Sequence, residues 1–221
     1  DNEATLNMAK LYQIKNLLEE VKTFVDQVYF PDVAAIGAMY APWLGYGAGV
    51  TNYLSVPDLP LNPEGTEFQM PGGTIMNKDL GTFKPITSFN DEYFRDNVAE
   101  SIAHSWYDGD WQLHPWEEDT VPAYSEFDHE GRYSWVKAPR FDGQPMQVGP
   151  LAQVLAALAA GDETTTKYAL ETLDVAGSVA GAKLTPAVLH STLGRHAARM
   201  IRCRVIAEQA LSHWEALVAN I

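Results

Sequence analysis

The chain has 221 residues, of which 46% are hydrophobic, and this is enough material for one large domain or two small ones. Its 29 acidic side chains outnumber its 15 basic ones, and the resulting formal charge of −14 argues against a nucleic acid partner, because phosphate binding needs a basic surface. The single cysteine, Cys203, excludes an internal disulfide and any Cys-x-x-Cys metal or redox site.

The N-terminal part of the chain has the pattern of an amphipathic helix. Apolar residues recur every three or four positions from about Thr5 to Val28, with lysine and glutamate between them. We expect Pro31 to end this helix and Asp32 to cap a short second helix over residues 33–40. A first helix of this length predicts a partner of similar length, supplied by the far end of the chain.

The middle of the chain is rich in residues that break regular structure. Residues 41–150 contain eleven glycines and eleven prolines, which predicts loops rather than long helices. One helix is expected over residues 91–106, where apolar side chains recur at four-residue steps. Short strands are expected near residues 50–56, 67–70, 73–77 and 82–87.

Helical patterns return after this region. Gly149 and Pro150 predict the start of a helix that continues to residue 160, and a second helix is expected over residues 163–175. Thr185-Pro186 predicts the start of a last helix, which extends to Ala219 with a possible kink at Gly194.

Together these patterns predict a mainly α fold. Long antiparallel helices from residues 1–40 and 150–221 form a bundle-like core, and residues 41–149 form a Gly/Pro-rich loop insertion with minor β structure. We treat residues 1–221 as a single partial domain. No apolar run reaches the roughly 18 residues of a membrane span, and the first residues lack the features of a signal peptide. Because the sequence begins without methionine, we expect a processed, trimmed or excerpted chain.

The stretch from His104 to Ala152 concentrates side chains that are able to carry chemistry. The spacing of His104, His114 and Glu117 would permit a zinc site formed by a loop. The alternative is that each histidine fixes loop backbone through hydrogen bonds while Trp106 packs beside it.

Cationic side chains form two further candidate groups. Lys137 and Arg140 flank a proline, and such a rigid cationic segment fixes a carboxylate or stabilises developing charge, unless both simply pair with nearby acids. Arg195, Arg199 and Arg202 share one helix face and would pair with acidic loops or with a partner subunit.

A third interpretation concerns carboxylates among tryptophans. Asp108, Asp110, Glu117 and Asp119 lie in a tryptophan-rich segment, as paired carboxylates do beside sugar-binding aromatic residues in glycosidases. No recognisable spacing supports this carbohydrate-active hypothesis.

Several blocks of consecutive residues stand out along nearly the whole chain. They are Phe24-Val25-Asp26 with Val28-Tyr29 and Pro31-Asp32; His104-Ser105-Trp106-Tyr107; His114-Pro115-Trp116; Tyr133-Ser134-Trp135 followed by Lys137-Ala138-Pro139-Arg140; Pro145-Met146 followed by Gly149-Pro150-Leu151-Ala152; and Ser191-Thr192-Leu193-Gly194-Arg195. In this order the blocks resemble the central region of the large subunit of nickel–iron hydrogenases. The resemblance is strongest to the uptake-type, membrane-associated members of that family.

The resemblance implies reversible H2 oxidation at a nickel–iron centre with CO and CN ligands, electron transfer to an iron–sulfur small subunit, and a location on the periplasmic side of a bacterial membrane. It also implies four thiolate ligands from two Cys-x-x-Cys pairs, which this chain lacks. We therefore expect the central portion of a larger subunit, which binds no metal alone and contacts the subunit's remaining parts. Seven residues are expected to act as structural anchors around the buried metal site, without binding the metal themselves. They are His104, Trp106, His114, Lys137, Arg140, Arg195 and Arg199. The alternatives are a non-catalytic assembly protein on the same framework and the carbohydrate-active hypothesis.

Overall fold

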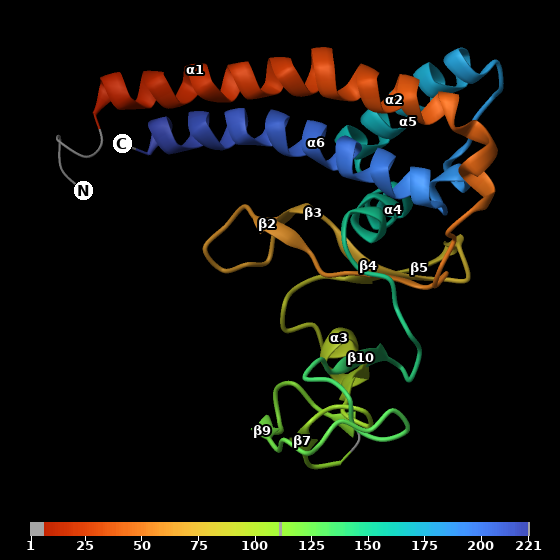
Figure 1. The fold of residues 1–221 in the computed structure, drawn as a ribbon. Helices are drawn as coiled ribbons and strands as arrows, with labels where there is room; N and C mark the ends of the chain where they lie inside the picture. Colours follow the sequence, from red (N-terminus) through yellow and green to blue (C-terminus); the bar gives the residue numbers. More distant parts are fainter. Residues whose placement is uncertain (1–6, 111, 221) are drawn as a thin grey trace. The chain divides into compact units, whose positions relative to one another are not determined.

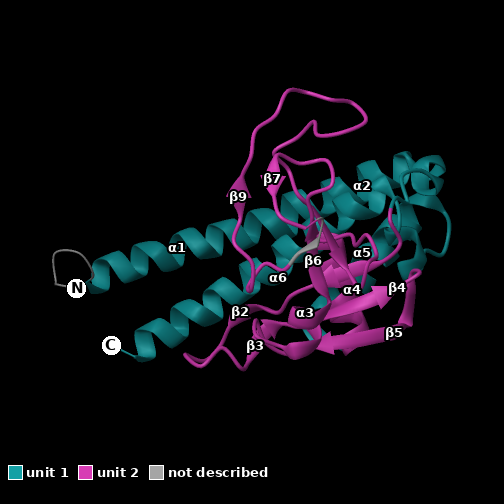
Figure 2. Cartoon of the chain, turned by 90° about the horizontal axis from the view of Figure 1, so that it is seen from below, with its two compact units in different colours: residues 1–49, 161–221 teal, residues 50–160 magenta. Residues whose placement is uncertain are grey.

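The computed structural model describes residues 7–110 and 112–220, which form two compact units. Unit 1 contains the chain up to Gly49 and from Gly161 onward, and unit 2 is Val50–Ala160 (Figure 2). The described part of unit 1 is helical, and all strands of the described chain lie in unit 2. None of the described helices has the length and apolar character needed to cross a membrane.

Unit 1 is organised around two long helices that lie side by side, α1 and α6 (Figure 1). The indole N–H of Trp214 on α6 donates to the backbone oxygen of Leu11 on α1 at 3.0 Å, and Leu11 is buried. Helix α5 packs against both α2 and α6. The elements are α1 (Met8–Phe24), the π-helical turn η1 (Val25–Tyr29), α2 (Phe30–Met39), the 3-10 helix η2 (Ala41–Gly45), α5 (Glu163–Ala180), the 3-10 helix η3 (Pro186–Leu189) and α6 (Thr192–Ala219).

The prediction that Pro31 ends the first helix is wrong. Helical structure continues from α1 through η1 into α2, with Pro31 in the first turn of α2. Proline clashes with the carbonyl four residues earlier in a regular helix, and the wider π turn directly before Pro31 relieves that clash. The expected helix also covered Thr5 and Leu6, which lie outside the described residues.

The last helix begins later than predicted. Only a 3-10 turn follows Thr185, and α6 starts at Thr192, where the Ser191 hydroxyl accepts a hydrogen bond from the Gly194 N–H at 3.0 Å. This side-chain cap satisfies a backbone donor that the first helical turn leaves free. A Cβ on Gly194 would lie 2.1 Å from the Leu189 oxygen, so the glycine permits the sharp entry into α6.

Unit 2 contains short strands and two helices. Among its described residues the strands form four small sheets, ordered β1-β4-β5, β10-β6-β8, β2-β3 and β7-β9, and all their pairings are antiparallel. The elements are β1 (Tyr53–Ser55), β2 (Asp58–Pro60), β3 (Phe68–Met70), β4 (Gly72–Met76), β5 (Asp79–Ile86), α3 (Glu92–Asn97), β6 (Val98–Ser101), β7 (Tyr107–Asp108), β8 (Gln112–Leu113), β9 (Val121–Pro122), β10 (Ala138–Phe141) and α4 (Pro150–Ala160).

The core of unit 2 lies where α4 covers the sheet β1-β4-β5. Tyr53 and Ile75 on the sheet are buried together with Val154 and Leu155 on the helix. The four expected extended segments each contain a strand. Helix α4 was predicted at the right residues, and its apolar surface packs on this sheet.

The predicted fold class is wrong. The described chain is 49% helical and 18% strand, and its helices do not form a long antiparallel bundle. One reason is that α4, expected in the bundle core, belongs to the sheet of unit 2. The prediction for the insertion is also too helical, because the helix expected over residues 91–106 ends at Asn97 and Val98–Ser101 pairs with β10 instead.

Candidate functional site

A network of side-chain hydrogen bonds holds the loops that follow β6. His104 Nδ1 lies 2.7 Å from the Gly131 oxygen, and the His104 ring stacks on Tyr133 with centroids 5.2 Å apart. The Ser105 hydroxyl donates to the Val136 oxygen at 2.5 Å. These contacts join two segments that are about thirty residues apart in the sequence. Residues 104–105 and residues 131–136 therefore hold each other in one conformation.

Trp106 lies at the centre of an aromatic cluster. Its backbone N–H donates to Ser134 at 3.0 Å and its side chain is buried. Trp135 packs edge-on against Trp106 at 5.1 Å and stacks on Tyr124 at 6.0 Å. The Tyr107 hydroxyl donates to the Trp135 oxygen at 2.9 Å. The sequence-predicted anchor Trp106 thus supports two aromatic residues whose own faces remain exposed.

Lys137 and Arg140, predicted as a cationic pair, have different surroundings. Lys137 Nζ forms an ion pair with Glu100 and donates to the Thr120 hydroxyl at 2.9 Å. Arg140 lies on β10, and its guanidinium donates to the oxygen of the preceding residue, Pro139, at 2.9 Å. Lys137 therefore joins β6 to the loop before β9, whereas Arg140 makes only a local bond among those described.

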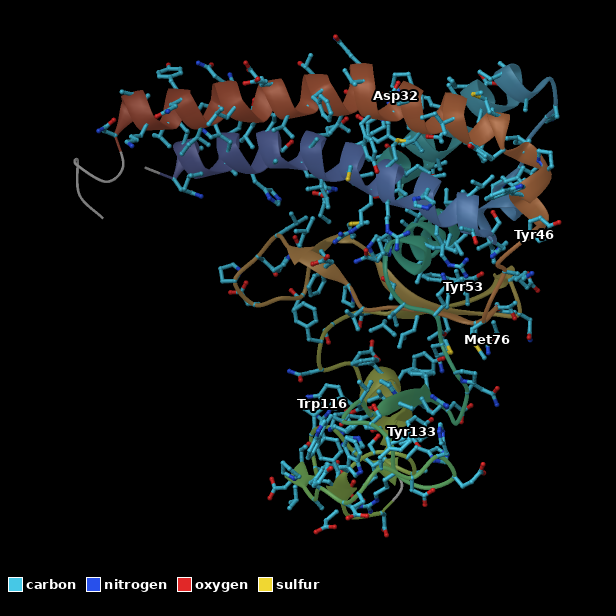
Figure 3. The ribbon with its side chains drawn as sticks, viewed as in Figure 1. Asp32, Tyr46, Tyr53, Met76, Trp116 and Tyr133 are labelled. Carbon is cyan, nitrogen blue, oxygen red and sulfur yellow. The ribbon has the colours of Figure 1, made fainter. Side chains whose placement is uncertain are left out.

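His114 fixes backbone as His104 does. Its Nε2 lies 2.8 Å from the Arg95 oxygen, and its Nδ1 accepts from the Trp116 N–H at 3.3 Å. Trp116 and Tyr133 are labelled among the side chains of this loop system in Figure 3. Within residues 7–110 and 112–220, no group of three or more His, Cys, Asp or Glu is placed to hold a metal ion. The zinc hypothesis for His104, His114 and Glu117 therefore gains no support.

The remaining predicted anchors, Arg195 and Arg199, belong to unit 1. The Arg195 guanidinium donates to the backbone oxygens of Gly47 and Ala48, the second at 3.0 Å. Gly47 has a φ of +73°, and a Cβ there would overlap Thr192, so the glycine run turns tightly where Arg195 holds it. Arg199 donates to the Arg195 oxygen at 3.1 Å, one helical turn earlier.

Arg204 is a buried charged residue that the sequence analysis did not single out. Its Nε donates to Asp26 at 2.9 Å and its second guanidinium nitrogen contacts Glu171 at 2.9 Å. The guanidinium lies 4.1 Å from the ring centroid of Phe30 and 4.0 Å from that of Tyr168. This network connects η1, α2, α5 and α6. The signal available in the sequence was an arginine on the apolar face of its helix.

Two ionisable groups of this network have shifted pKa values. Burial favours the neutral acid, but hydrogen bonds from Lys22 and Arg204 outweigh it and hold the pKa of Asp26 below its ordinary value. Burial raises the pKa of the Tyr168 hydroxyl far above its ordinary value, and its hydrogen bond to Glu208 raises it further. At neutral pH the network therefore contains a charged Asp26 and a neutral Tyr168.

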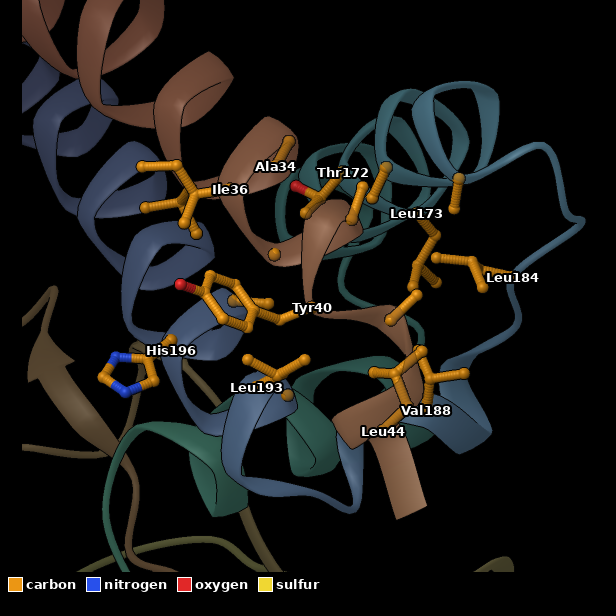
Figure 4. Close-up of a pocket in the computed structure, with 18 of the residues that line it drawn as sticks. Ala34, Ile36, Tyr40, Leu44, Thr172, Leu173, Leu184, Val188, Leu193 and His196 are labelled. Atoms are coloured by element: carbon orange, nitrogen blue, oxygen red, sulfur yellow. The ribbon is translucent and has the colours of Figure 1, made fainter. Parts of the chain in front are cut away.

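Unit 1 also contains an apolar cavity of about 600 Å³ that is open to solvent on one side. Tyr40 between α2 and η2, Leu44 on η2, Leu173 on α5 and Leu193 on α6 line it, and His196 lies at its edge (Figure 4). Apolar side chains make up most of the lining. The cavity thus has the size and character of a site for an apolar group, and it contains few polar atoms to orient a reaction.

The residues of this chain do not fit a thiolate-bound nickel site. Its only cysteine, Cys203, is exposed and unpaired by any disulfide. Soft thiolate ligands are what a nickel–iron centre requires, and one cysteine cannot supply the set. No step of metal chemistry is therefore assigned to residues of this chain.

Comparisons with known proteins find hydrogenases along the whole length of the chain. The family model described as nickel-dependent hydrogenase matches residues 1–221. The Hydrogenase-2 large chain of Escherichia coli (strain K12) is 42% identical over all of this chain and 39% of its own length. The uptake hydrogenase large subunit of Afipia carboxidovorans is 32% identical over 99% of this chain and 39% of its own.

Solved structures show the same relationship. The Ni-Fe-Se hydrogenase of Desulfovibrio vulgaris Hildenborough aligns with a TM-score of 0.74 and 25% identity, over 95% of this chain and 40% of that chain. The chain thus spans about two fifths of the length of the relatives it matches. Because the family model covers every residue, the chain belongs to the nickel-dependent hydrogenase family.

Proposed function

We propose that the chain forms the central portion of a nickel–iron hydrogenase large subunit, which converts H2 reversibly into two protons and two electrons. The electrons leave through an iron–sulfur small subunit, and the metal ligands come from parts of the subunit outside these 221 residues. The observation that carries the proposal is the match of the family model to the whole chain, combined with coverage of 39% of the relatives. The proposal includes the periplasmic side of a bacterial membrane as the location.

The exposed apolar surface of unit 1 supports a larger subunit. Five residues of α1 and η1 follow a three- and four-residue spacing, and each is at least 40% exposed. They are Ile14, Leu17, Val21, Phe24 and Val28. This set, called here the α1 stripe, contains no charged residue and repeats as the contact positions of packed helices do. Soluble proteins rarely leave such a surface open, so helices from the remaining parts of the subunit are its expected cover.

A supporting role suits the candidate site residues better than a reacting role. His104 and His114 bond to backbone oxygens, and Lys137 is paired with Glu100. Groups occupied in this way hold loops in place, and a general acid or base needs a substrate within hydrogen-bond reach. The proposed task of these loops is to give the surroundings of the buried metal site a fixed shape.

The test uses the complete large subunit that carries these residues, expressed and matured together with its small subunit. Infrared spectroscopy should detect the stretching bands of iron-bound CO and CN, and the sample should oxidise H2. Ser105→Ala removes the bond to Val136 and should lower the yield of matured enzyme while the band positions stay unchanged. Ser178→Ala, on the exposed surface of α5, is the matched control.

Two outcomes would count against the proposal. Absence of nickel and of CO and CN bands from the complete mature pair would favour a non-catalytic assembly protein on the same framework. A shift of the bands in Ser105→Ala would contradict the purely supporting role of the loops, because it would indicate direct contact with the metal ligands.

A further inference from the structure

Arg204 has one nitrogen whose hydrogen-bond acceptor is not supplied by the described residues. Its side chain is 8% exposed, its Nε donates to Asp26 at 2.9 Å, and its Nη2 contacts Glu171 at 2.9 Å. Nη1 is also buried, and it has no hydrogen-bond partner within residues 7–110 and 112–220. A buried donor without an acceptor costs free energy, and this cost is larger when the donor is charged. Nη1 therefore indicates a bound acceptor.

Aromatic rings cover the guanidinium but do not replace that acceptor. The ring centroids of Phe30 and Tyr168 lie 4.1 Å and 4.0 Å from its central carbon. Contacts of this kind stabilise the positive charge. An N–H group directed at a ring face forms a weaker bond than one directed at an oxygen atom. Nη1 therefore still favours an oxygen atom as its partner.

Glu208 is a carboxylate close to this arginine that the arginine does not contact directly. The two residues are four positions apart on α6 and therefore lie on one face of the helix. Burial raises the pKa of Tyr168, so its hydroxyl is protonated at neutral pH and donates to Glu208, while the ring of the same tyrosine lies against Arg204. The ion pairs of Arg204 within the described chain are nevertheless those with Asp26 and Glu171. Two polar groups that are neighbours without touching are commonly joined by a water molecule.

The charges around Nη1 favour a neutral ligand. The charged side chains of this network are Lys22, Asp26, Glu171, Arg204 and Glu208. Two cations and three carboxylates give it a net charge of −1. A further anion would be repelled by the carboxylates, and a further cation would lie against the guanidinium. A neutral molecule that both accepts and donates hydrogen bonds suits the position between Nη1 and Glu208.

Water is the neutral molecule that fits the access to this position. Nη1 is buried, so a side chain from another segment or another protein would have to displace its neighbours to reach it. Glu208 is half-buried, which leaves its end of the site within reach of solvent. Internal waters bind buried polar groups that lack other partners and make about three hydrogen bonds each. Nη1 as a donor and Glu208 as an acceptor provide two of these bonds.

We propose that Arg204 and Glu208 together hold an internal water molecule, which accepts a hydrogen bond from Nη1 and donates one to the Glu208 carboxylate. The water joins two parts of the network, because Arg204 is bonded to Asp26 on η1 and Glu208 is bonded to Tyr168 on α5. The site belongs to unit 1 alone and does not depend on the function proposed above.

The first test is a crystal structure of the complete protein that carries these residues, at a resolution that defines ordered waters. A water oxygen should lie about 2.7–3.2 Å from both Nη1 and a carboxylate oxygen of Glu208. A direct contact between Nη1 and Glu208 would overturn the inference. So would a map without any density between the two side chains.

Variants of Glu208 test the bridge in solution, by thermal unfolding of the same protein. Glu208→Gln keeps an oxygen that accepts a hydrogen bond from water, whereas Glu208→Leu removes every acceptor. Glu208→Leu should therefore lower the unfolding temperature about threefold more than Glu208→Gln does. Glu215→Gln and Glu215→Leu, at an exposed position of the same helix, are the matched controls and should differ from each other by less than about 1 °C.

The bond from Tyr168 to Glu208 is separated from the bridge by repeating the Glu208 variants in Tyr168→Phe. The excess loss in Glu208→Leu should persist there, because the bond between the water and residue 208 is still present in Glu208→Gln and absent from Glu208→Leu. If Glu208→Gln lowers the unfolding temperature as much as Glu208→Leu in either background, the carboxylate acts through its charge and the water bridge is overturned.

Discussion

Charged side chains are used in opposite ways in unit 1 and in residues 104–136 of unit 2, which contain eight carboxylates and one arginine. In unit 1 the buried Arg204 is paired with Asp26 and Glu171 and covered by aromatic rings, so its charge contributes to holding helices together. In residues 104–136 all eight carboxylates are exposed, and the side chains of His104 and Ser105 fix the loops through hydrogen bonds to backbone oxygens instead. The comparison separates charges that hold helices together from charges that stay exposed to solvent.

The strongest way to break this comparison is to remove the paired charge of unit 1. Arg204→Ala removes the guanidinium that pairs with Asp26 and Glu171 and should lower the free energy of unfolding by about 3–5 kcal/mol. Urea denaturation followed by circular dichroism measures the loss. Arg199→Ala, at an exposed position of the same helix, is the control and should cost less than about 0.5 kcal/mol. Equal losses in the two variants would show that the network does not hold unit 1 together.

A glycine pair tests the packing of unit 1 without changing charge. Gly194→Ala places a Cβ 2.1 Å from the backbone oxygen of Leu189 and should lower stability by about 1–3 kcal/mol. Gly37→Ala lies inside α2, where the new Cβ meets no atom within 4 Å apart from the helix's own backbone and its chain neighbours, and it should raise stability by about 0.5–1 kcal/mol. Thermal unfolding of both variants measures the difference, and a stabilising Gly194→Ala would contradict the tight entry into α6.

Acid should weaken unit 1 through Asp26. Because its pKa is lower in the folded chain than in the unfolded chain, the unfolded state binds the proton first as pH falls. The stability that Asp26 contributes is fully present above its unfolded pKa of about 3.9 and is lost as pH falls through the lower folded value. Asp26→Asn should therefore lower stability at pH 7 and flatten its dependence on pH between about 5 and 2. An unchanged acid dependence in Asp26→Asn would contradict the assignment.

The smallest effect on stability is expected at the α1 stripe. Leu17→Gln and Val21→Gln replace exposed side chains and should change the free energy of unfolding of the 221-residue chain by less than about 0.5 kcal/mol. The same changes should reduce its self-association, as sedimentation velocity would measure, because they shorten the open apolar surface. Leu11→Gln, at the buried contact with α6, is the destabilising control. A large loss of stability from the stripe variants would show that the stripe is already covered within the chain.

Local sequence patterns predicted most of the regular elements. The periodicity of α1, the start of α5 and the short strands of the sheet β1-β4-β5 are set by nearby residues, and the structure has them close to the expected positions. Helix α5 continues past its predicted end at residue 175 to Ala180. The pattern over residues 91–106 was misleading because Val98–Ser101 pairs with β10, some forty residues away. Four-residue apolar spacing does not reveal such a distant partner.

The same holds for the candidate site: nearby residues in the sequence show which side chains are unusual, but not which distant residues they contact. The sequence identified His104, Trp106 and Lys137 as unusual but left open what they contact, and their partners lie 17 to 37 residues away. Arg204 was missed because its partner Asp26 is 178 positions away. Recognition of the family did not depend on these contacts, since it followed from short blocks of consecutive residues.

The π-helical turn η1 determines which way the α1 stripe faces. A π turn carries one residue more than an α turn, and each residue of a helix advances its faces by about 100°. Deleting one residue within Val25–Tyr29 would restore an ordinary helix and rotate α1 by about that angle relative to α2. The stripe would then point away from its present direction, and Asp26 would leave the reach of Arg204. The number of residues in η1 therefore sets the rotation of α1 about its axis. Loops elsewhere in the chain would tolerate a change of one residue, but the same change in η1 would turn the whole first helix.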